Sequence, residues 1–235
     1  MSEAPTEPGH QRPDAFWQEI LDARAVAPPP WSSAFPAKLP GGRILFLPIR
    51  PLEGTDTAIA SLILNQAAFS VQDALADILA DALVKYAPDR VGGMPTLGLS
   101  LAQAVAQRLG HTRFVPHGTS RKFWYREELS VPLSSITSPD AQKRLYLDPR
   151  LTELLRGQNL ALIDDAVSTG SSMAAGVELL LKIGVQPTVL GVAMLQTERW
   201  QSLSKVAPVV GALRSPLLKR VPGGWDIAGS REKQS

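Results

Sequence analysis

Two adjacent carboxylates and a run of small hydroxyl side chains are the residues of this chain best suited to chemistry. Asp164 and Asp165 are followed, after two apolar residues, by Ser-Thr-Gly-Ser-Ser at 168–172. A short loop before a helix offers free N–H groups and hydroxyls, which favour an anion such as phosphate. Carboxylates beside a phosphate repel it, unless a group between them needs hydrogen-bond acceptors. A sugar with two hydroxyls and a 5-phosphate satisfies both parts of the stretch.

The flanking residues predict the elements that position this stretch. Residues 160–163 are an unbroken apolar run, typical of a strand buried on both faces of a parallel sheet. After the loop, apolar residues recur at helical spacing through residues 173–183. We therefore expect the acids at the carboxyl edge of the strand and the loop at the amino end of the helix. The alternative is a strand that ends in an Asp-Asp turn with a serine helix cap.

This order of strand, Asp-Asp, apolar pair and hydroxyl-rich loop resembles the signature of the type I phosphoribosyltransferases, which bind 5-phosphoribosyl 1-pyrophosphate (PRPP). The resemblance implies that Asp164 and Asp165 hold the ribose hydroxyls and help, mostly indirectly, to place Mg²⁺. Two departures from the family pattern are mild, with Ala166 in place of a branched residue and Ser171 where Gly is common. The implied PRPP site here comprises Ala166, Val167, Ser168, Thr169, Gly170, Ser171 and Ser172.

A second glycine-containing loop precedes this motif at residues 92–98, and a helical apolar pattern follows it at 99–109. Glycines allow the backbone to approach a ligand closely, and the end of the loop would lie at a helix amino terminus. In the family, a loop with a similar Gly-x-Pro-x-x-Gly pattern holds the pyrophosphate of PRPP. The alternative is a Gly/Pro turn between strand and helix. The residues implied in pyrophosphate binding are Gly93, Met94, Pro95, Thr96, Leu97 and Gly98.

The stretch 118–149 is too long for a simple connection in a compact domain, and loops of this length are often lids or binding elements. It opens with basic and aromatic residues, and residues 131–136 and 144–147 suggest the two arms of a hairpin. The resemblance implies a mobile catalytic loop here, opened by Arg121 and Lys122. The alternatives are a solvated basic loop or a nucleic-acid contact through cations and aromatics.

Composition excludes several other classes of protein. The net charge of +2 argues against wholesale nucleic-acid binding. The chain contains no cysteine, which excludes disulfides and thiolate chemistry, and its three histidines lack metal-ligand spacing. No apolar run approaches membrane-spanning length, and residues 1–9 lack the form of a signal peptide. We therefore expect a cytoplasmic protein that does not contact a membrane.

The alternation of strands and helices after residue 89 predicts an α/β fold, a doubly wound parallel sheet of the type I phosphoribosyltransferase kind. A hairpin of residues 43–49 and 58–64, after a short helix from Pro13, would form a small N-terminal hood lobe. Ser70 and Asp73 suggest a capping box for a helix through residue 86. The expected organisation is a disordered tail at 1–12, the helix and hairpin lobe at 13–69, the α/β core at 70–222 and a polar, frayed tail at 223–235.

The resemblance implies an enzyme that uses Mg-PRPP to transfer 5-phosphoribosyl to a nucleobase, a purine and first of all adenine, with release of pyrophosphate. Trp200 could stack on the base, although a tryptophan here is more often part of the core. The family commonly forms homodimers. Two rival functions are a regulatory module that binds PRPP without turnover and a basic RNA-binding protein that reuses the fold. The presence of Arg121 and Lys122 favours the enzyme.

Overall fold

The computed structural model of the protein describes residues 15–22, 26–133 and 143–229. The segment 1–12, expected to be disordered, and residues 230–235 of the expected polar tail lie outside this part of the chain. The chain divides into two compact units. Unit 1 comprises Met1–Gln72, Gln196–Glu198 and Leu213–Ser235, and unit 2 comprises Asp73–Leu195 and Arg199–Ala212.

A five-stranded sheet forms the centre of unit 2. Strand β10 pairs with β9, β9 with β5 and β5 with β6, each in parallel, so the carboxyl ends of these strands meet at one edge. The expected parallel sheet is therefore confirmed. In sheet order the strands are β11 (Val209–Ser215), β10 (Val189–Gln196), β9 (Leu160–Val167), β5 (Arg90–Gly93) and β6 (Val115–Pro116).

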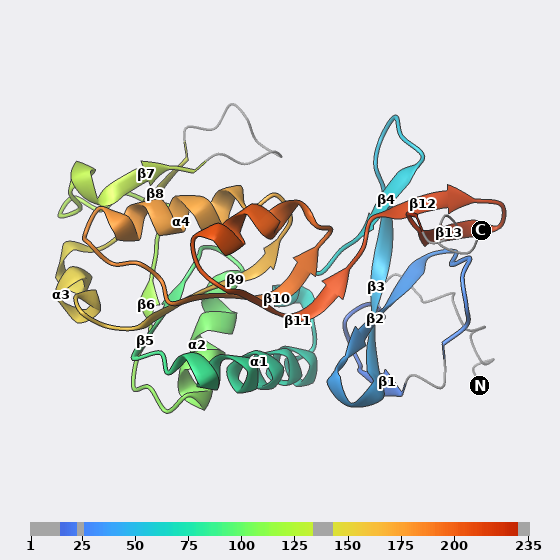
Figure 1. Ribbon diagram of the computed structural model, residues 1–235, viewed down its shortest axis with the longest axis horizontal. Helices are drawn as coiled ribbons and strands as arrows, with labels where there is room; N and C mark the ends of the chain where they lie inside the picture. The colour runs from blue at the N-terminus through green and yellow to red at the C-terminus, as the bar shows by residue number, and fades with distance from the viewer. Residues whose placement is uncertain (1–14, 23–25, 134–142, 230–235) are drawn as a thin grey trace. The chain divides into compact units, whose positions relative to one another are not determined.

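Helices cover both faces of this sheet, as expected for a doubly wound fold (Figure 1). Helix α4 (Ser171–Leu181) lies on one face, and α1 (Phe69–Leu83) and α2 (Gly98–Arg108) lie on the other. A short helix, α3 (Thr152–Leu155), precedes β9. Single 3₁₀ turns occur at Pro40–Gly42, Leu64–Gln66, Val84–Tyr86, Glu127–Leu129 and Pro149–Leu151, and a longer 3₁₀ segment at Arg199–Lys205.

Two glycines show how closely the layers of unit 2 pack. A Cβ added to Gly176 of α4 would lie 3.0 Å from Leu162 Cδ2, and one added to Gly191 of β10 would lie 2.6 Å from Ile163 Cδ1 and 3.4 Å from Leu79 of α1. Leu162 therefore faces α4 and Ile163 faces α1, which is the alternation of a strand buried on both sides. Each such fully buried side chain contributes about 1.5–3 kcal/mol to stability.

The beginning of α1 differs from the expectation. The helix begins at Phe69, so Ser70 lies inside its first turn and does not cap it. Asp73 accepts a hydrogen bond from Arg108 Nη2 at 2.9 Å, and Arg108 also pairs with Asp77. The predicted capping box is therefore wrong, because Asp73 serves to join α1 to the carboxyl end of α2.

Unit 1 contains a six-stranded sheet. The expected hairpin is confirmed, because β3 and β4 pair antiparallel. Strand β3 pairs with β2 as far as Pro48 and with β4 from Ile49, so it changes partner at a residue that has no N–H to donate. The strands are β1 (Leu21–Asp22), β3 (Arg43–Pro51), β4 (Thr57–Ala60), β12 (Leu218–Val221) and β13 (Gly224–Ile227), with β2 (Ala34–Leu39) paired to β3.

Two expectations about unit 1 are wrong. In place of a helix after Pro13, the described residues form a turn at 16–17 followed by β1, and Trp17 is buried with its Nε1 donating to Ser61 O at 3.1 Å. In place of a frayed tail, residues 224–227 form β13 on β12. Trp225 explains the second difference, because it is buried beneath the guanidinium of Arg220, 4.3 Å from its ring centroid.

The stretch between β6 and β9 is largely irregular, as expected. Strands β7 (Ser130–Pro132) and β8 (Arg144–Tyr146) pair antiparallel, which confirms the predicted hairpin. The residues that join them, 134–142, lie outside the described part of the chain.

Candidate functional site

Strand β9 carries both acids. It continues past the predicted end at residue 163 to Val167, because β10 pairs with it as far as Leu195 opposite Val167. Pairing with β5 on the other side ends at Gly93 opposite Ile163. Asp164 and Asp165 therefore lie where the sheet loses one of its two neighbouring strands, at the edge where the carboxyl ends meet.

The two carboxylates differ in exposure. Asp164 is only 6% exposed, whereas Asp165 is half-buried. Asp164 Oδ1 accepts a hydrogen bond from the backbone N–H of Asp165 at 2.9 Å. Both acids lie at the expected carboxyl edge of the strand, but Asp164 is buried there and only Asp165 is partly accessible.

Burial determines the electrostatics of this pair. It raises the pKa of Asp164 well above the usual value of an aspartate, and the neighbouring charge of Asp165 raises the same pKa further. Burial also raises the pKa of Asp165, against the hydrogen bonds it accepts. Ligand hydroxyls that donate to the carboxylates, or a cation near them, would favour their ionised forms.

The hydroxyl-rich loop leads directly into α4. Gly170 has φ 86° and forms the N-cap position, and a Cβ there would lie 2.9 Å from Leu203 Cδ1. Both the backbone angle and the space therefore require glycine. The first helical hydrogen bond runs from Ala174 N to Gly170 O at 2.8 Å, so the N–H groups of residues 171–173 have no partner inside the helix.

The side chains of this loop remain accessible. Ser168, Thr169, Ser171 and Ser172 are all half-buried. Thr169 Oγ1 lies 3.3 Å from Ser171 Oγ, which gathers hydroxyls at the amino end of α4. Ser171 N donates a long hydrogen bond to Thr169 Oγ1 at 3.5 Å. Hydroxyl donors, N–H groups without a partner inside the helix and the positive end of the helix dipole occur together here, which is the arrangement that binds phosphate.

The second loop, between β5 and α2, is held at both ends. At its start, Gly93 O accepts two hydrogen bonds from His117, and Met94 N donates to Ile163 O at 2.8 Å. At its end, a Cβ on Gly98 would lie 2.7 Å from both Cα and Oδ1 of Asp164. The two loops predicted from the sequence are therefore in contact through β9. The Pro95–Thr96 peptide between these ends is cis.

Not every residue of the second loop can offer its side chain to a ligand. Met94 is fully buried and faces α4, where a Cβ on Gly176 would lie 2.5 Å from its sulfur. The backbone N–H of Met94 is also taken, by Ile163 O, and Leu97 lies in the turn before α2.

The basic segment after β6 is exposed. Arg121 forms an ion pair with Glu127 at 3.7 Å, with both side chains about 60% exposed, and Lys122 is exposed beside it. Phe123 is 95% exposed, whereas Trp124 is anchored by its Nε1 donating to Asp148 at 3.0 Å. Among the described residues, neither Arg121 nor Lys122 forms an ion pair or hydrogen bond with the acids or with either loop.

Trp200 lies within the hydrophobic core on the α4 side of the sheet and is 5% exposed. Its ring presents little surface to a ligand. This burial argues against the base-stacking role and favours the core role considered for it.

Sequence reasoning missed His117, which was set aside with the other histidines for lack of metal-ligand spacing. His117 is buried at the end of β6 and contacts the start of the second loop. One indication of His117 is present in the sequence, because it is a polar residue between the apolar residues of the strand and Gly118.

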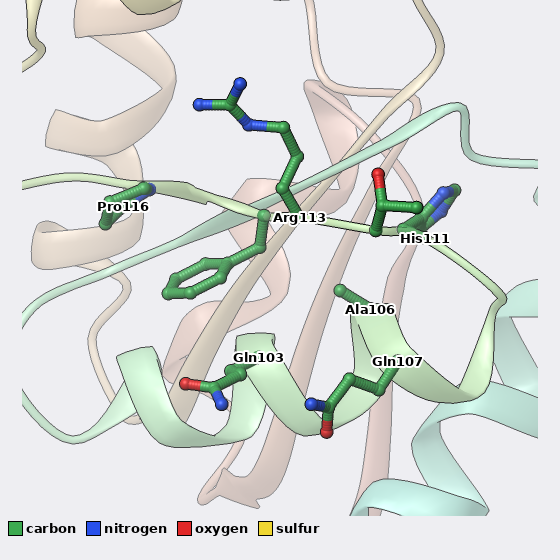
Figure 2. Close-up of a pocket in the computed structure, with 8 residues that line it drawn as sticks. Gln103, Ala106, Gln107, His111, Arg113 and Pro116 are labelled. Carbon is green, nitrogen blue, oxygen red and sulfur yellow. The ribbon is translucent and has the colours of Figure 1, made fainter.

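A cavity of about 380 Å³ lies between the carboxyl-terminal half of α2 and the segment that enters β6 (Figure 2). Neither of the two predicted loops contributes to its walls. The lining residues are Gln103, Ala106, Gln107, His111, Thr112, Arg113, Phe114 and Pro116.

Two further features are absent from the described residues. These residues contain no group of three or more His, Cys, Asp or Glu side chains placed to share a metal ion. They also contain no helix with the length and apolar character needed to cross a membrane.

Comparison with known proteins gives the family. The family model for the phosphoribosyl transferase domain matches residues 61–211. Adenine phosphoribosyltransferase from Mycolicibacterium smegmatis is 31% identical over 150 residues, which cover 59% of this chain and 70% of that protein.

Solved structures agree on the fold. Adenine phosphoribosyltransferase from Thermoanaerobacter pseudethanolicus superposes with a TM-score of 0.57 at 16% identity, covering 72% of this chain and 95% of that one. The enzyme from Giardia lamblia, complexed with 9-deazaadenine, gives 0.55 at 20% identity, covering 72% and 93%. The resemblance seen in the sequence is confirmed, and nothing in these comparisons supports the regulatory alternative. The chain belongs to the phosphoribosyl transferase domain family and is a phosphoribosyltransferase.

Proposed function

We propose that this enzyme transfers the 5-phosphoribosyl group of Mg-PRPP to a ring nitrogen of a purine, with adenine as the first candidate, and releases pyrophosphate. The observation that carries the proposal is the contact of Gly98 with Asp164, which joins two anion-binding loops around a pair of acids. The adenine assignment rests on the likeness to the Mycolicibacterium smegmatis enzyme.

Each part of the site has a proposed role. Asp164 and Asp165 accept hydrogen bonds from the ribose hydroxyls, and the 5-phosphate binds at residues 166–172. The backbone of residues 93–98 binds the pyrophosphate. Such loops at the carboxyl ends of neighbouring parallel strands are where ligands of doubly wound sheets bind.

The reaction requires placement and charge stabilisation more than proton transfer. The bond from C1 of the ribose to the pyrophosphate oxygen breaks while the bond to the base nitrogen forms. Positive charge develops on the ribose, and negative charge leaves with the pyrophosphate. The loops therefore contribute by holding the two ends of PRPP in line with the base and by offering N–H groups to the departing charge.

Mg²⁺ fits this donor set as an ion carried largely by the substrate. Magnesium usually takes one or two carboxylates together with substrate phosphates and water, and the described residues supply the adjacent carboxylates Asp164 and Asp165 without a third ligand. When bound, the ion would neutralise part of the pyrophosphate charge. The same pair of carboxylates would align the ribose hydroxyls.

Arg121 and Lys122 are proposed to complete the site from the segment between β6 and β7. Their exposure and the long irregular segment that carries them support a loop that closes over bound PRPP. Closure would bring two cations to the pyrophosphate and exclude water, which limits hydrolysis of PRPP.

The setting of the enzyme is also a proposal. We infer that it works in the cytoplasm as a homodimer and does not bind nucleic acid. The absence of cysteine and the near-neutral charge of +2 support the location and the lack of nucleic-acid binding.

The test is an incubation of the purified protein with Mg-PRPP and single bases: adenine, hypoxanthine, guanine, xanthine and uracil. We expect pyrophosphate and a nucleotide in equal amounts with adenine, and neither product from the Asp164→Asn/Asp165→Asn variant. PRPP binding by calorimetry without turnover of any base would instead identify a sensor. RNA binding without PRPP binding would contradict both assignments.

A further inference from the structure

His117 is a buried histidine that none of these roles uses. It directly follows β6 and is 2% exposed. Its Nδ1 lies 3.1 Å from the carbonyl oxygen of Gly93, and its backbone N–H donates to the same oxygen at 3.0 Å. One residue therefore supplies two hydrogen bonds to a single carbonyl.

This contact determines the tautomer of His117. A carbonyl oxygen can only accept, so Nδ1 must carry the proton. Burial lowers the pKa of His117 to about 4, although the bond to Gly93 acts in the opposite direction, so the ring is neutral near pH 7. Nε2 is then an acceptor, and it is buried with no hydrogen-bond partner among the described residues.

The unpaired Nε2 shows that this histidine is not an optimal choice for packing. A buried polar atom without a partner destabilises a fold, and an apolar side chain of similar size would avoid that cost. What an apolar side chain could not provide is the second hydrogen bond to Gly93. The contribution specific to a histidine at this position is therefore made at that carbonyl.

The peptide group between Gly93 and Met94 is held on both edges. His117 holds its carbonyl oxygen, and Ile163 O accepts from its N–H at 2.8 Å. This is the peptide at which β5 ends and the loop 93–98 begins. One hydrogen-bonding partner comes from the end of β6, and the other is the residue of β9 directly before Asp164.

His117 also stands at the start of the segment that carries the two cations. The next residue, Gly118, is fixed to Tyr146 of β8 by a pair of backbone hydrogen bonds of 3.0 and 2.8 Å. The segment that bears Arg121 and Lys122 therefore leaves the sheet from a fixed point. The loop 93–98 and this segment are linked through the same imidazole.

We propose that His117 is a positioning residue for pyrophosphate: its Nδ1–H orients the Gly93–Met94 peptide, so that the loop 93–98 presents its N–H groups to the leaving group. The inference rests on the proposed function for the identity of the ligand. It adds a residue outside both predicted motifs that acts through Gly93 and touches no substrate itself.

Three variants separate the two ring nitrogens. In His117→Asn, the side-chain amide can occupy the place of Nδ1 and still donate to Gly93. His117→Gln can place its amide only near Nε2, and His117→Leu removes both polar atoms. We expect the His117→Leu and His117→Gln variants to raise the KM for PRPP and the Kd for inorganic pyrophosphate at least tenfold. In both variants the KM for adenine should change less than twofold. In the His117→Asn variant, the KM for PRPP and the Kd for pyrophosphate should lie within about threefold of the wild-type values.

A spectroscopic measurement tests the contact in the wild-type protein itself. Nitrogen-15 NMR of the ring-labelled wild-type protein distinguishes the two neutral tautomers, and only three histidines need assignment. We expect one histidine in the Nδ1–H form at pH 7, and its signals should be absent from the spectrum of His117→Asn.

The outcomes separate this inference from the proposed function. A wild-type enzyme that turns over PRPP, together with a folded His117→Leu variant of unchanged KM, would overturn the inference alone. An Nε2–H tautomer at His117 would do the same. A wild type that binds neither PRPP nor pyrophosphate would overturn the proposed function and, with it, the pyrophosphate role, whatever the tautomer.

Discussion

Gly98, the first residue of α2, lies directly against Asp164: a Cβ at Gly98 would stand 2.7 Å from both Cα and Oδ1 of the aspartate. One of those atoms belongs to the backbone of a central strand, so it cannot move aside. The contact brings the helix that follows one loop onto the acid that precedes the other. The spacing between the two proposed halves of the PRPP site therefore depends on the absence of a side chain at residue 98.

Replacement of Gly98 by alanine should separate these halves. We expect Gly98→Ala to lower stability by about 1–3 kcal/mol, as overpacking does, and to lower kcat/KM for PRPP more than tenfold. Denaturant unfolding and steady-state kinetics would measure the two effects. Gln107→Ala, at an exposed position of the same helix, is the control and should change neither. Wild-type kinetics in Gly98→Ala would show that the contact is not needed.

Replacement of Asp164 by asparagine should stabilise the protein while it impairs turnover. Its raised pKa means that the ionised form is disfavoured in the folded state. The contribution of Asp164 to the free energy of unfolding is therefore fully present below the unfolded-state pKa of about 3.8, where the carboxyl is protonated in both states. It is lost as pH rises through the higher folded-state pKa. Asparagine is neutral throughout and can still accept from Asp165 N.

We accordingly expect Asp164→Asn to match the wild type in unfolding free energy near pH 3, below the unfolded-state pKa, and to exceed it at pH 7. Because a tenfold change in proton affinity corresponds to about 1.4 kcal/mol, the excess should be of the order of 1 kcal/mol or more. Urea unfolding across this pH range is the measurement, with the exposed Asp81→Asn as control. A variant less stable than the wild type at pH 7 would contradict the assignment.

The N-cap glycine of α4 offers a double-mutant test. Gly170→Ala must place a side chain at φ 86° and against Leu203, so we expect a loss of about 1–2 kcal/mol from the backbone alone and more from the contact. PRPP affinity should fall as the loop shifts. Leu203→Ala provides space for the new methyl group, so the combined variant should be less destabilised than the sum of the two single variants. Strict additivity would mean that the side chains do not meet.

The exposed lysine of the basic segment should affect catalysis more than binding. If Lys122 reaches the pyrophosphate only when the segment closes, Lys122→Ala lowers kcat while the Kd for PRPP changes little. Single-turnover kinetics and calorimetry would separate the two quantities. Lys205→Ala, at an exposed position in the 3₁₀ segment 199–205, serves as the charge control. A fall in PRPP affinity at unchanged kcat would place Lys122 in the open complex instead.

The local patterns of the core were sufficient to predict its elements. The apolar run at 160–163 and the helical stripe after Gly170 correspond to observed elements, because each depends on residues close in sequence. The hairpin predicted from residues 131–136 and 144–147 corresponds, in the described residues, to β7 and β8. The two loops were also recognisable, since glycines and hydroxyls at strand-to-helix junctions have few other uses.

What the sequence could not provide are contacts between distant residues. Asp164 looks like any acid at the end of a strand, and its burial depends on Gly98, far away in the chain. Asp73 matched a capping pattern but pairs with Arg108. Trp225 lies in a polar tail, and its burial comes with Arg220 over its ring, the pairing of β13 with β12 and a backbone bridge to Trp31.

The order in which the ribosome makes this chain follows from the pairing of β4 with β12. Thr57 and Ala58 are synthesised about 160 residues before Lys219 and Leu218, which lie opposite them, so β4 leaves the exit tunnel with one edge unpaired. All of the residues that make up unit 2 are translated in that interval. Nascent chains that end at residue 212, and are arrested on an added linker long enough to span the exit tunnel, should therefore carry a protease-resistant core and a first sheet that lacks its last two strands.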